Sequence, residues 1–145
     1  MIRIGPAIPR ISAIGHAASG LMLCASSPFT WFYNEPGPLS YVLPWAPAGY
    51  ETWSGRLALL AGVALVASAA WDLHRGRLYG RPFIRTAGSI LAAAAAVGGL
   101  IEVPDTVPLV VYYHLGSGYW VAVAGAALAG LSSAVGLAAR SPHMP

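Results

Sequence analysis

His16 and His74 are the two side chains in this sequence whose type best suits cofactor chemistry. A pair of neutral imidazoles can ligate a haem iron or another metal ion. His16 lies within an apolar stretch and His74 ends another, so both are predicted near the same side of a membrane. We favour a different role for His16, as a hydrogen-bonded histidine inside a helix bundle, because no second pair of ligands accompanies the two. The sequence therefore predicts no bound cofactor.

A second group of potential ligands combines carboxylates with one histidine. Glu102, Asp105 and His114 lie in the second of two predicted loops between apolar segments, and Glu35 and Glu51 lie in the first. Such groups could bind a divalent metal ion. Their spacing matches no compact metal motif such as HExxH. We therefore favour simpler roles for Glu102, which could cap the helix that precedes it or pair with Arg56.

Recognisable motifs for catalysis are missing from the sequence. It contains no Walker A loop, no nucleophile elbow and no CxxC pair. Cys24 is the only cysteine, which excludes an internal disulfide and a cysteine-based metal cluster. We predict that the protein is not an enzyme.

The composition indicates that much of the surface faces lipid. Of the 145 residues, 57% are hydrophobic and 9% are charged, whereas about a quarter of the residues of a soluble domain are charged. A helix of about 20 apolar residues can cross a bilayer. We predict an all-α membrane protein with one domain, 1–145, a bundle of four transmembrane helices. The predicted spans are 11–33, 53–73, 84–101 and 119–139, and the outer loops are 34–52 and 102–118.

The charged start of the chain leaves a second interpretation of the first span. A charged N-terminus followed by an apolar stretch is also the pattern of a signal peptide. The apolar residues continue through Phe29 and Phe32, which favours a membrane span.

The arginines predict how the helices are oriented. All eight basic residues are arginines, and seven of them flank the predicted spans on one side. The positive-inside rule places that side in the cytoplasm, with both termini, and indicates a multi-pass protein of the bacterial plasma membrane. Arginines at membrane borders give no argument for nucleic-acid binding. We interpret the arginines of the central connector as topological anchors that can also contact anionic lipid head groups: Arg75, Arg77, Arg81 and Arg85.

Two further charges call for partners. Arg56 lies just inside the second span on the acidic side, where we predict a structural salt bridge with Glu51, Glu102 or Asp105. An anion or lipid-phosphate contact is the alternative. Asp72 precedes Arg75 by three positions, a helical spacing that predicts an ion pair at the helix end.

Small residues predict how the helices pack. In a bilayer, helices associate through close backbone approach and polar contacts. The last span carries two rows of small residues at a spacing of four, and we expect both rows to pack against other helices. The first row is Ala122, Ala126, Gly130, Ala134 and Ala138, and the second is Gly125, Ala129 and Ser133.

Proline and aromatic residues predict the outer end of the bundle. Pro28 should kink the first span near its outer end. The β-branched and aromatic run from Val110 to Tyr113 favours a strand, which could pair with Tyr41–Leu43 in a small β-like outer cap. Alternatively, this run dips into the membrane. We expect the following residues, together with Trp45 of the first loop, to lie near the outer interface: Trp31, Phe32, Tyr33, Trp53, Tyr119 and Trp120.

Two resemblances accompany this architecture. Four helices with a long aromatic first outer loop resemble the claudin-like tetraspan architecture, and Trp45 and Trp53 are present in that region. Claudins also carry a cysteine pair there, which this sequence lacks. The stretch GSGYW before an alanine-rich last span resembles small four-span membrane proteins of actinobacteria. These resemblances imply a fold and no activity.

Three functions are compatible with this pattern. The first is a small accessory or structural membrane subunit that packs against other membrane proteins or self-associates, in contact with membrane lipids. The second is a small transporter or channel component, working as an oligomer around His16. The third is a haem- or metal-binding membrane redox protein. We favour the first, because the sequence has strong packing features and no catalytic constellation.

Overall fold

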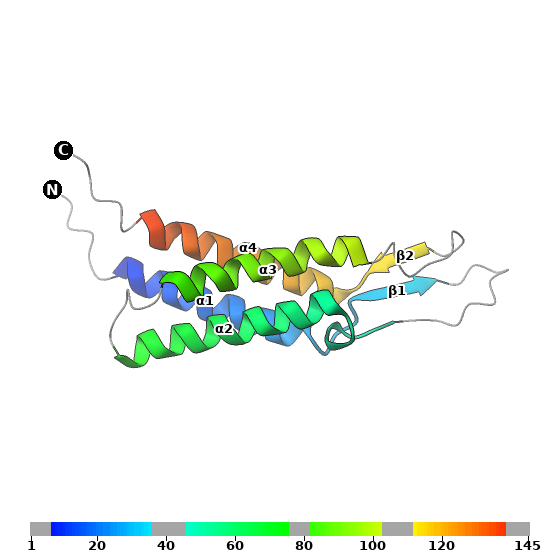
Figure 1. Cartoon of the computed structure of the whole chain (residues 1–145), viewed down its shortest axis with the longest axis horizontal. Helices are drawn as coiled ribbons and strands as arrows, with labels where there is room; N and C mark the ends of the chain where they lie inside the picture. Colours follow the sequence, from blue (N-terminus) through cyan, green and yellow to red (C-terminus); the bar gives the residue numbers. More distant parts are fainter. Residues whose placement is uncertain (1–6, 36–45, 76–81, 103–111, 139–145) are drawn as a thin grey trace.

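A computed structural model of the chain describes residues 7–35, 46–75, 82–102 and 112–138. Trp45, Arg77, Arg81 and Asp105, which the sequence analysis singled out, lie outside these ranges. Long helices dominate the described residues and run along one axis (Figure 1). The elements are α1 (Ala7–Ser26), β1 (Phe32–Glu35), the 3-10 turn η1 (Gly49–Glu51), α2 (Trp53–Arg75), α3 (Pro82–Glu102), β2 (Tyr112–Leu115) and α4 (Ser117–Ala138).

Three helices in the described ranges are long and apolar enough to cross a membrane. By length and composition these are Trp53–His74, Phe83–Glu102 and Ser117–Ala138. Their bounds lie close to the predicted ranges 53–73, 84–101 and 119–139. Alanine and leucine dominate these segments, and both favour helix because they lose little side-chain freedom there.

The helices are arranged so that neighbours along the chain run in opposite directions. α1 packs against α2 and α4, and α3 packs against the other sides of α2 and α4. α1 begins and α4 ends at the same end of the bundle, where α2 also ends and α3 begins (Figure 1). We call this the terminal end; the opposite end, which carries β1, β2 and η1, is the ribbon end.

The first helix is shorter than the predicted span 11–33. α1 ends at Ser26, and the next residues form a turn in which the Phe29 N–H donates to the Ser26 carbonyl at 3.2 Å. Pro28 has no N–H to donate, and it disfavours helical backbone at the residue before it. The proline therefore ends the helix, where a kink was expected.

After this turn the chain folds back over the ribbon end of the bundle. Trp31, Phe32 and Tyr119 are buried there, with ring centroids 5.9 to 6.4 Å apart. The Trp31 indole N–H donates to the Ser26 carbonyl at 3.0 Å, so its polar atom is satisfied. These three rings were expected near the outer interface; the structure shows that they are buried in the core at the ribbon end, because the short α1 lets them enter it. Trp53 and Trp120 are exposed, each about half covered.

A two-stranded antiparallel ribbon lies beyond this aromatic cluster. Phe32 pairs with Leu115, and Tyr33 pairs with His114, on which its ring stacks at 5.1 Å. The predicted strand partner, residues 41–43, lies outside the described residues. β2 instead pairs with Phe32–Glu35, of which the first two residues were assigned to the first membrane span and the last two to the first outer loop.

The two glycines of the GSGYW stretch are required by close backbone contacts. The Gly116 and Gly118 N–H groups donate to the carbonyls of Trp31 and Thr30 at 2.7 and 3.0 Å. A Cβ atom at Gly116 would collide with the Thr30 backbone, and one at Gly118 would lie 2.9 Å from the Ser26 carbonyl oxygen. Glycine therefore allows the start of α4 to touch the turn that follows α1.

The two rows of small residues on α4 face different ways. Gly125 and Ala129 of the second row are buried, and Ala126 packs beside the core. Gly130 is exposed, with no atom within 4 Å of where its Cβ would be. A row at a spacing of four rotates by about 40° per step around a helix with 3.6 residues per turn. The first row therefore begins inside the bundle and leaves it from Gly130 onward.

Substitution of Gly62 tests the close crossing of α1 and α2. Gly20 of α1 faces Gly62 of α2, and a Cβ at Gly62 would lie 2.8 Å from both the Gly20 carbonyl oxygen and the Cys24 sulfur. We expect Gly62→Ala to destabilise the bundle by about 1–3 kcal/mol, the usual cost of overpacking. Unfolding in mild detergent, followed by circular dichroism, measures this change.

Gly130→Ala is the matched control, because the added methyl group meets no atom and alanine favours helix. Its stability should be unchanged or slightly raised. Equal destabilisation by the two substitutions would contradict the crossing.

Candidate functional site

Polar side chains gather inside the terminal half of the bundle, and every helix contributes. They are buried or half-buried in an otherwise apolar interior. Four are serines, one is a histidine and two form an ion pair: Ser12, Ser89, Ser132, Ser133, His16, Asp72 and Arg85. Buried polar groups are unfavourable unless they are hydrogen-bonded. Their mutual contacts therefore define a polar cluster that must be assembled from all four helices.

An ion pair joins α2 to α3 in this cluster. Arg85 Nη2 donates to Asp72 Oδ2, and the side chains are 8% and 1% exposed. Asp72 stands one turn before the end of α2, and Arg85 stands one turn after the start of α3. The helical hairpin therefore brings together two charges that are thirteen positions apart.

This pair bears on two sequence-based predictions. Asp72 was expected to pair with Arg75, whose side chain the structure does not describe, so that prediction stays untested; the partner that the structure shows is Arg85. Arg85 was also expected to be a topological anchor at the membrane border. Its side chain is buried in the bundle, where the paired Asp72 carboxylate offsets part of the cost of removing the arginine charge from water, and its role as an anchor stays a prediction.

His16 uses both ring nitrogens in contacts with α1 and α4. Nδ1 lies 2.7 Å from the Ser12 carbonyl oxygen, and Nε2 lies 3.0 Å from the Ser133 hydroxyl. The Ser133 hydroxyl in turn lies 3.0 Å from that of Ser89. Because a carbonyl oxygen only accepts, Nδ1 carries the hydrogen, which assigns the tautomer of the neutral ring.

The hydroxyls next to His16 can adapt to either charge state of the ring. With a neutral imidazole, Ser89 donates to Ser133, and Ser133 donates to Nε2. With an imidazolium, Nε2 donates to Ser133, Ser133 donates to Ser89, and Ser89 donates to the Arg85 carbonyl, 2.9 Å away. Rotation of two hydroxyls therefore keeps His16 hydrogen-bonded whether or not it holds the second proton.

The structure does not bring the predicted haem or metal ligands together at this cluster. His74 is exposed near the end of α2 and does not line the pocket beside His16. Among the described residues, no group of three or more histidine, cysteine, aspartate and glutamate side chains is placed to hold a metal ion. Of the other predicted ligands, His114 lies in the ribbon, and Asp105 lies outside the described ranges.

Glu102 caps a helix, but not the one that precedes it. Its carboxylate accepts hydrogen bonds from the N–H groups of Trp53 and Ser54, at 3.0 and 3.2 Å, and from the Ser54 hydroxyl. The first N–H groups of a helix lack partners within the helix, and a negative charge is favourable beside them. Glu102, the last residue of α3, thus joins that helix to the start of α2.

Arg56 does not form the predicted salt bridge with Glu51 or Glu102 in the described part of the chain. Its Nε donates to the Tyr50 carbonyl at 2.9 Å. The Glu51 carboxylate accepts from the Ala48 N–H at 2.8 Å, and the Glu102 carboxylate accepts from the first N–H groups of α2. Both carboxylates accept hydrogen bonds from backbone N–H groups, and the Arg56 side chain is exposed.

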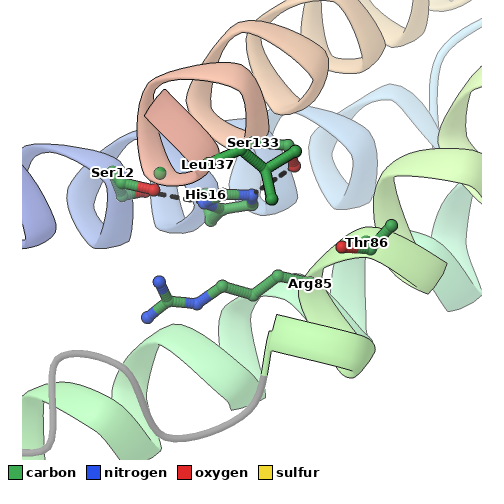
Figure 2. A pocket seen from close by; sticks show the side chains of 7 residues that line it. Ser12, His16, Arg85, Thr86, Ser133 and Leu137 are labelled. Atoms are coloured by element: carbon green, nitrogen blue, oxygen red, sulfur yellow. Dashed lines mark hydrogen bonds between the residues drawn. The ribbon is translucent and has the colours of Figure 1, made fainter. Parts of the chain in front are cut away.

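A small pocket that is open to the surface lies beside His16 (Figure 2). Figure 2 shows His16 of α1 on one side, bonded to Ser12 and Ser133, and the long Arg85 side chain of α3 running along the other side. Thr86 and Leu137 are exposed, so the pocket opens between α3 and α4. The lining residues are Ser12, His16, Arg85, Thr86, Ser133, Gly136 and Leu137.

Sequence reasoning identified only part of this site. It singled out His16 and Arg85, the latter for another role, and it missed Ser12 and Thr86. One signal could have found Ser12: Ser12, His16 and Ser19 recur at spacings of three and four on an apolar helix, so they share one face. Ser19 donates to the Gly125 carbonyl at 2.7 Å, which places this polar face against α4.

Comparison with known proteins found no relative for this chain: no family model matches it, and no curated protein is significantly similar. The resemblance to actinobacterial four-span proteins and to the claudin-like architecture therefore stays a prediction.

Paired substitutions test whether the ion pair holds the polar cluster together. Arg85→Gln leaves the Asp72 carboxylate buried without a cation, and we expect it to cost about 3–5 kcal/mol of stability. The double variant Asp72→Asn with Arg85→Gln removes both charges; asparagine keeps the shape of the aspartate, and glutamine is a shorter neutral replacement for the arginine. It should regain most of that loss, as measured by unfolding in detergent.

Asp72→Asn alone completes the double-mutant cycle. It should also destabilise the protein, because it leaves the Arg85 guanidinium buried without a carboxylate. Single variants as stable as the wild-type protein would contradict a buried, coupled pair.

Proposed function

We propose that this chain is a small multi-pass protein of the plasma membrane that serves as an accessory or structural subunit. In this proposal all four helices span the bilayer, both termini lie in the cytoplasm, and the β1–β2 ribbon lies outside. The protein then docks against other membrane proteins or further copies of itself. The observation that carries the proposal is the division between an interior that holds the paired polar groups and an exterior of large apolar side chains.

The apolar exterior supports placement in a membrane. Leu131 and Phe83 are 67% and 81% exposed, and Leu60 and Ile90 are similarly uncovered on α2 and α3. A water-soluble monomer rarely exposes so continuous an apolar surface. Lipid tails or partner helices would cover these side chains at no cost.

Charge placement supports the proposed orientation. Arg10 and Arg75 belong to the terminal end of the bundle, whereas Glu51 and Glu102 belong to the ribbon end. Positive charge is favoured on the cytoplasmic side. The terminal end would therefore face the cytoplasm.

The contacts of the polar side chains support a structural role over transport or redox chemistry. His16, Asp72 and Arg85 bond to neighbouring helices, and Glu102 caps α2. These contacts join helix to helix. The outward row on α4 that begins at Gly130 is a smooth surface on which another helix can pack closely.

Cysteine labelling of intact cells tests the orientation. In a Cys24→Ser background, Ser40→Cys should react with a membrane-impermeant maleimide added outside. Leu78→Cys should react only after the cells are permeabilised. Labelling of position 78 with protection of position 40 would invert the orientation.

Cross-linking in native membranes tests the docking role. A photoreactive amino acid at Leu131, beside the outward row on α4, should give a discrete protein adduct of higher mass. The same group at Leu60, exposed on α2, serves as the matched control and should give little or no such adduct. Monomers that cross-link only to lipid from both positions would count against an accessory subunit and favour a protein that works alone.

A further inference from the structure

The lining of the pocket beside His16 includes several side chains that can donate hydrogen bonds. Arg85 contributes a guanidinium, Ser133 and Thr86 contribute hydroxyls, and His16 contributes an imidazole. The lining includes no carboxylate, since Asp72 lies outside it. A donor-rich pocket of this kind suits a ligand that accepts several hydrogen bonds, such as an oxyanion.

Arg85 has an unused donor in this setting. A guanidinium has five N–H groups in a fixed fork, and one nitrogen, Nη2, binds Asp72. Nε of Arg85 and Oδ1 of Asp72 are both buried and have no hydrogen-bond partner. Arg85 itself is more than nine-tenths buried and lines the pocket. A buried donor without a partner is unfavourable, and an oxyanion in the pocket would supply the missing acceptor after a small adjustment of the side chain.

His16 allows the charge of an entering anion to be balanced. The charged and titratable groups around the pocket are His16 on α1, Asp72 on α2 and Arg85 on α3, and the lining residues of α4 carry none. Asp72 neutralises Arg85, so the net charge of the group is zero with a neutral ring and +1 with an imidazolium. Because the Ser133 and Ser89 hydroxyls can rotate, His16 can take up a proton with an anion and keep its hydrogen bonds.

The position of the pocket suits a ligand that arrives at the end of the bundle. Arg85 is the fourth residue of α3, so it lies about 5 Å along the axis from the start of that helix. The mouth between α3 and α4 is flanked by the exposed residues Thr86 and Leu137. With the membrane placement proposed above, this mouth lies near the cytoplasmic head groups.

We propose that this pocket binds the phosphate group of a ligand through the guanidinium of Arg85 and the hydroxyls of Thr86 and Ser133. A protonated His16 supplies positive charge beside the phosphate while its two N–H groups stay on Ser12 and Ser133, and the Ser133 hydroxyl then donates to the phosphate instead of to Ser89. A phosphate group is presented both by an anionic lipid head group and by free phosphate in solution. Only the lipid source rests on the proposed membrane function; the chemistry of the pocket does not.

Two variants perturb the pocket in different ways. A Cβ at Gly136 would lie 2.9 Å from the Ser12 hydroxyl oxygen, so Gly136→Ala narrows the pocket without touching a charge. Gly130→Ala adds the same methyl group to the same helix in open space and is the matched control. The double variant Asp72→Asn with Arg85→Gln removes the cation and leaves no unpaired charge behind.

The test uses the full chain in a maltoside detergent, which contains no phosphate. One arm adds short-chain phosphatidylglycerol, with diacylglycerol of the same chain length as the control that lacks phosphate. The other arm adds inorganic phosphate. Native mass spectrometry and calorimetric titration measure the binding, and unfolding curves verify that each variant is folded.

We expect the wild-type protein and Gly130→Ala to bind phosphatidylglycerol but not diacylglycerol, or to bind inorganic phosphate. Gly136→Ala and the double variant should each lose roughly tenfold or more in affinity, because hydrogen bonds between charged groups are lost or displaced. Binding in the first arm alone identifies a lipid source, and binding in the second arm identifies a free anion; either supports the site.

Two results would overturn the proposal. One is a wild-type protein that binds phosphatidylglycerol no better than diacylglycerol and does not bind inorganic phosphate. The other is unchanged affinity in the folded variants. If the double variant fails to fold, Gly136→Ala and Thr86→Val decide the matter, since neither disturbs the ion pair. A negative binding result would not change the outcome of the labelling and cross-linking experiments. The phosphate site and the proposed membrane function can therefore be rejected independently.

Discussion

The ion pair between Asp72 and Arg85 is the interaction on which the terminal half of this bundle depends. Two charges in an apolar interior are tolerated only when each compensates the other, so the end of α2 and the start of α3 must meet in one register. Arg85 then lies across the pocket from His16, whose ring reaches Ser133 on α4. Ser133 contacts Ser89, and Ser89 donates back to the Arg85 carbonyl. The network thus returns to α3, where the ion pair is anchored.

The ribbon end is held together by different forces. There the helix starts are capped by groups from elsewhere in the chain: Glu102 serves α2, and the Thr30 and Trp31 carbonyls accept from the glycines that precede or begin α4. Buried aromatic rings fill the space between them. Since the polar groups at both ends are directed inward, the outer faces are left almost entirely apolar, and these are the faces that lipid or a partner helix would cover.

Sequence reasoning located the helices better than it located their contacts. The bounds of α2, α3 and α4 follow from long apolar stretches. The length of an apolar stretch can be counted directly along the chain, without knowledge of what packs against it. The end of α1 was misplaced, because apolar residues continue past Pro28 although the backbone cannot continue as helix. The site was recovered in part: His16 stood out as an ionisable residue in an apolar segment, whereas Thr86 and Gly136 look ordinary in sequence and belong to the pocket only through their neighbours.

The sequence by itself determined the helical class, the apolar character of the helices and the asymmetric distribution of arginine, since each depends on the order of residue types along the chain. Only the tertiary structure decided which charge Asp72 meets, which helix Glu102 caps and which row of small residues on α4 faces inward. The physical reason is that these outcomes depend on the rotation and register of one helix against another. Those are set by the joint packing of residues that lie far apart in the chain, and no local pattern records them.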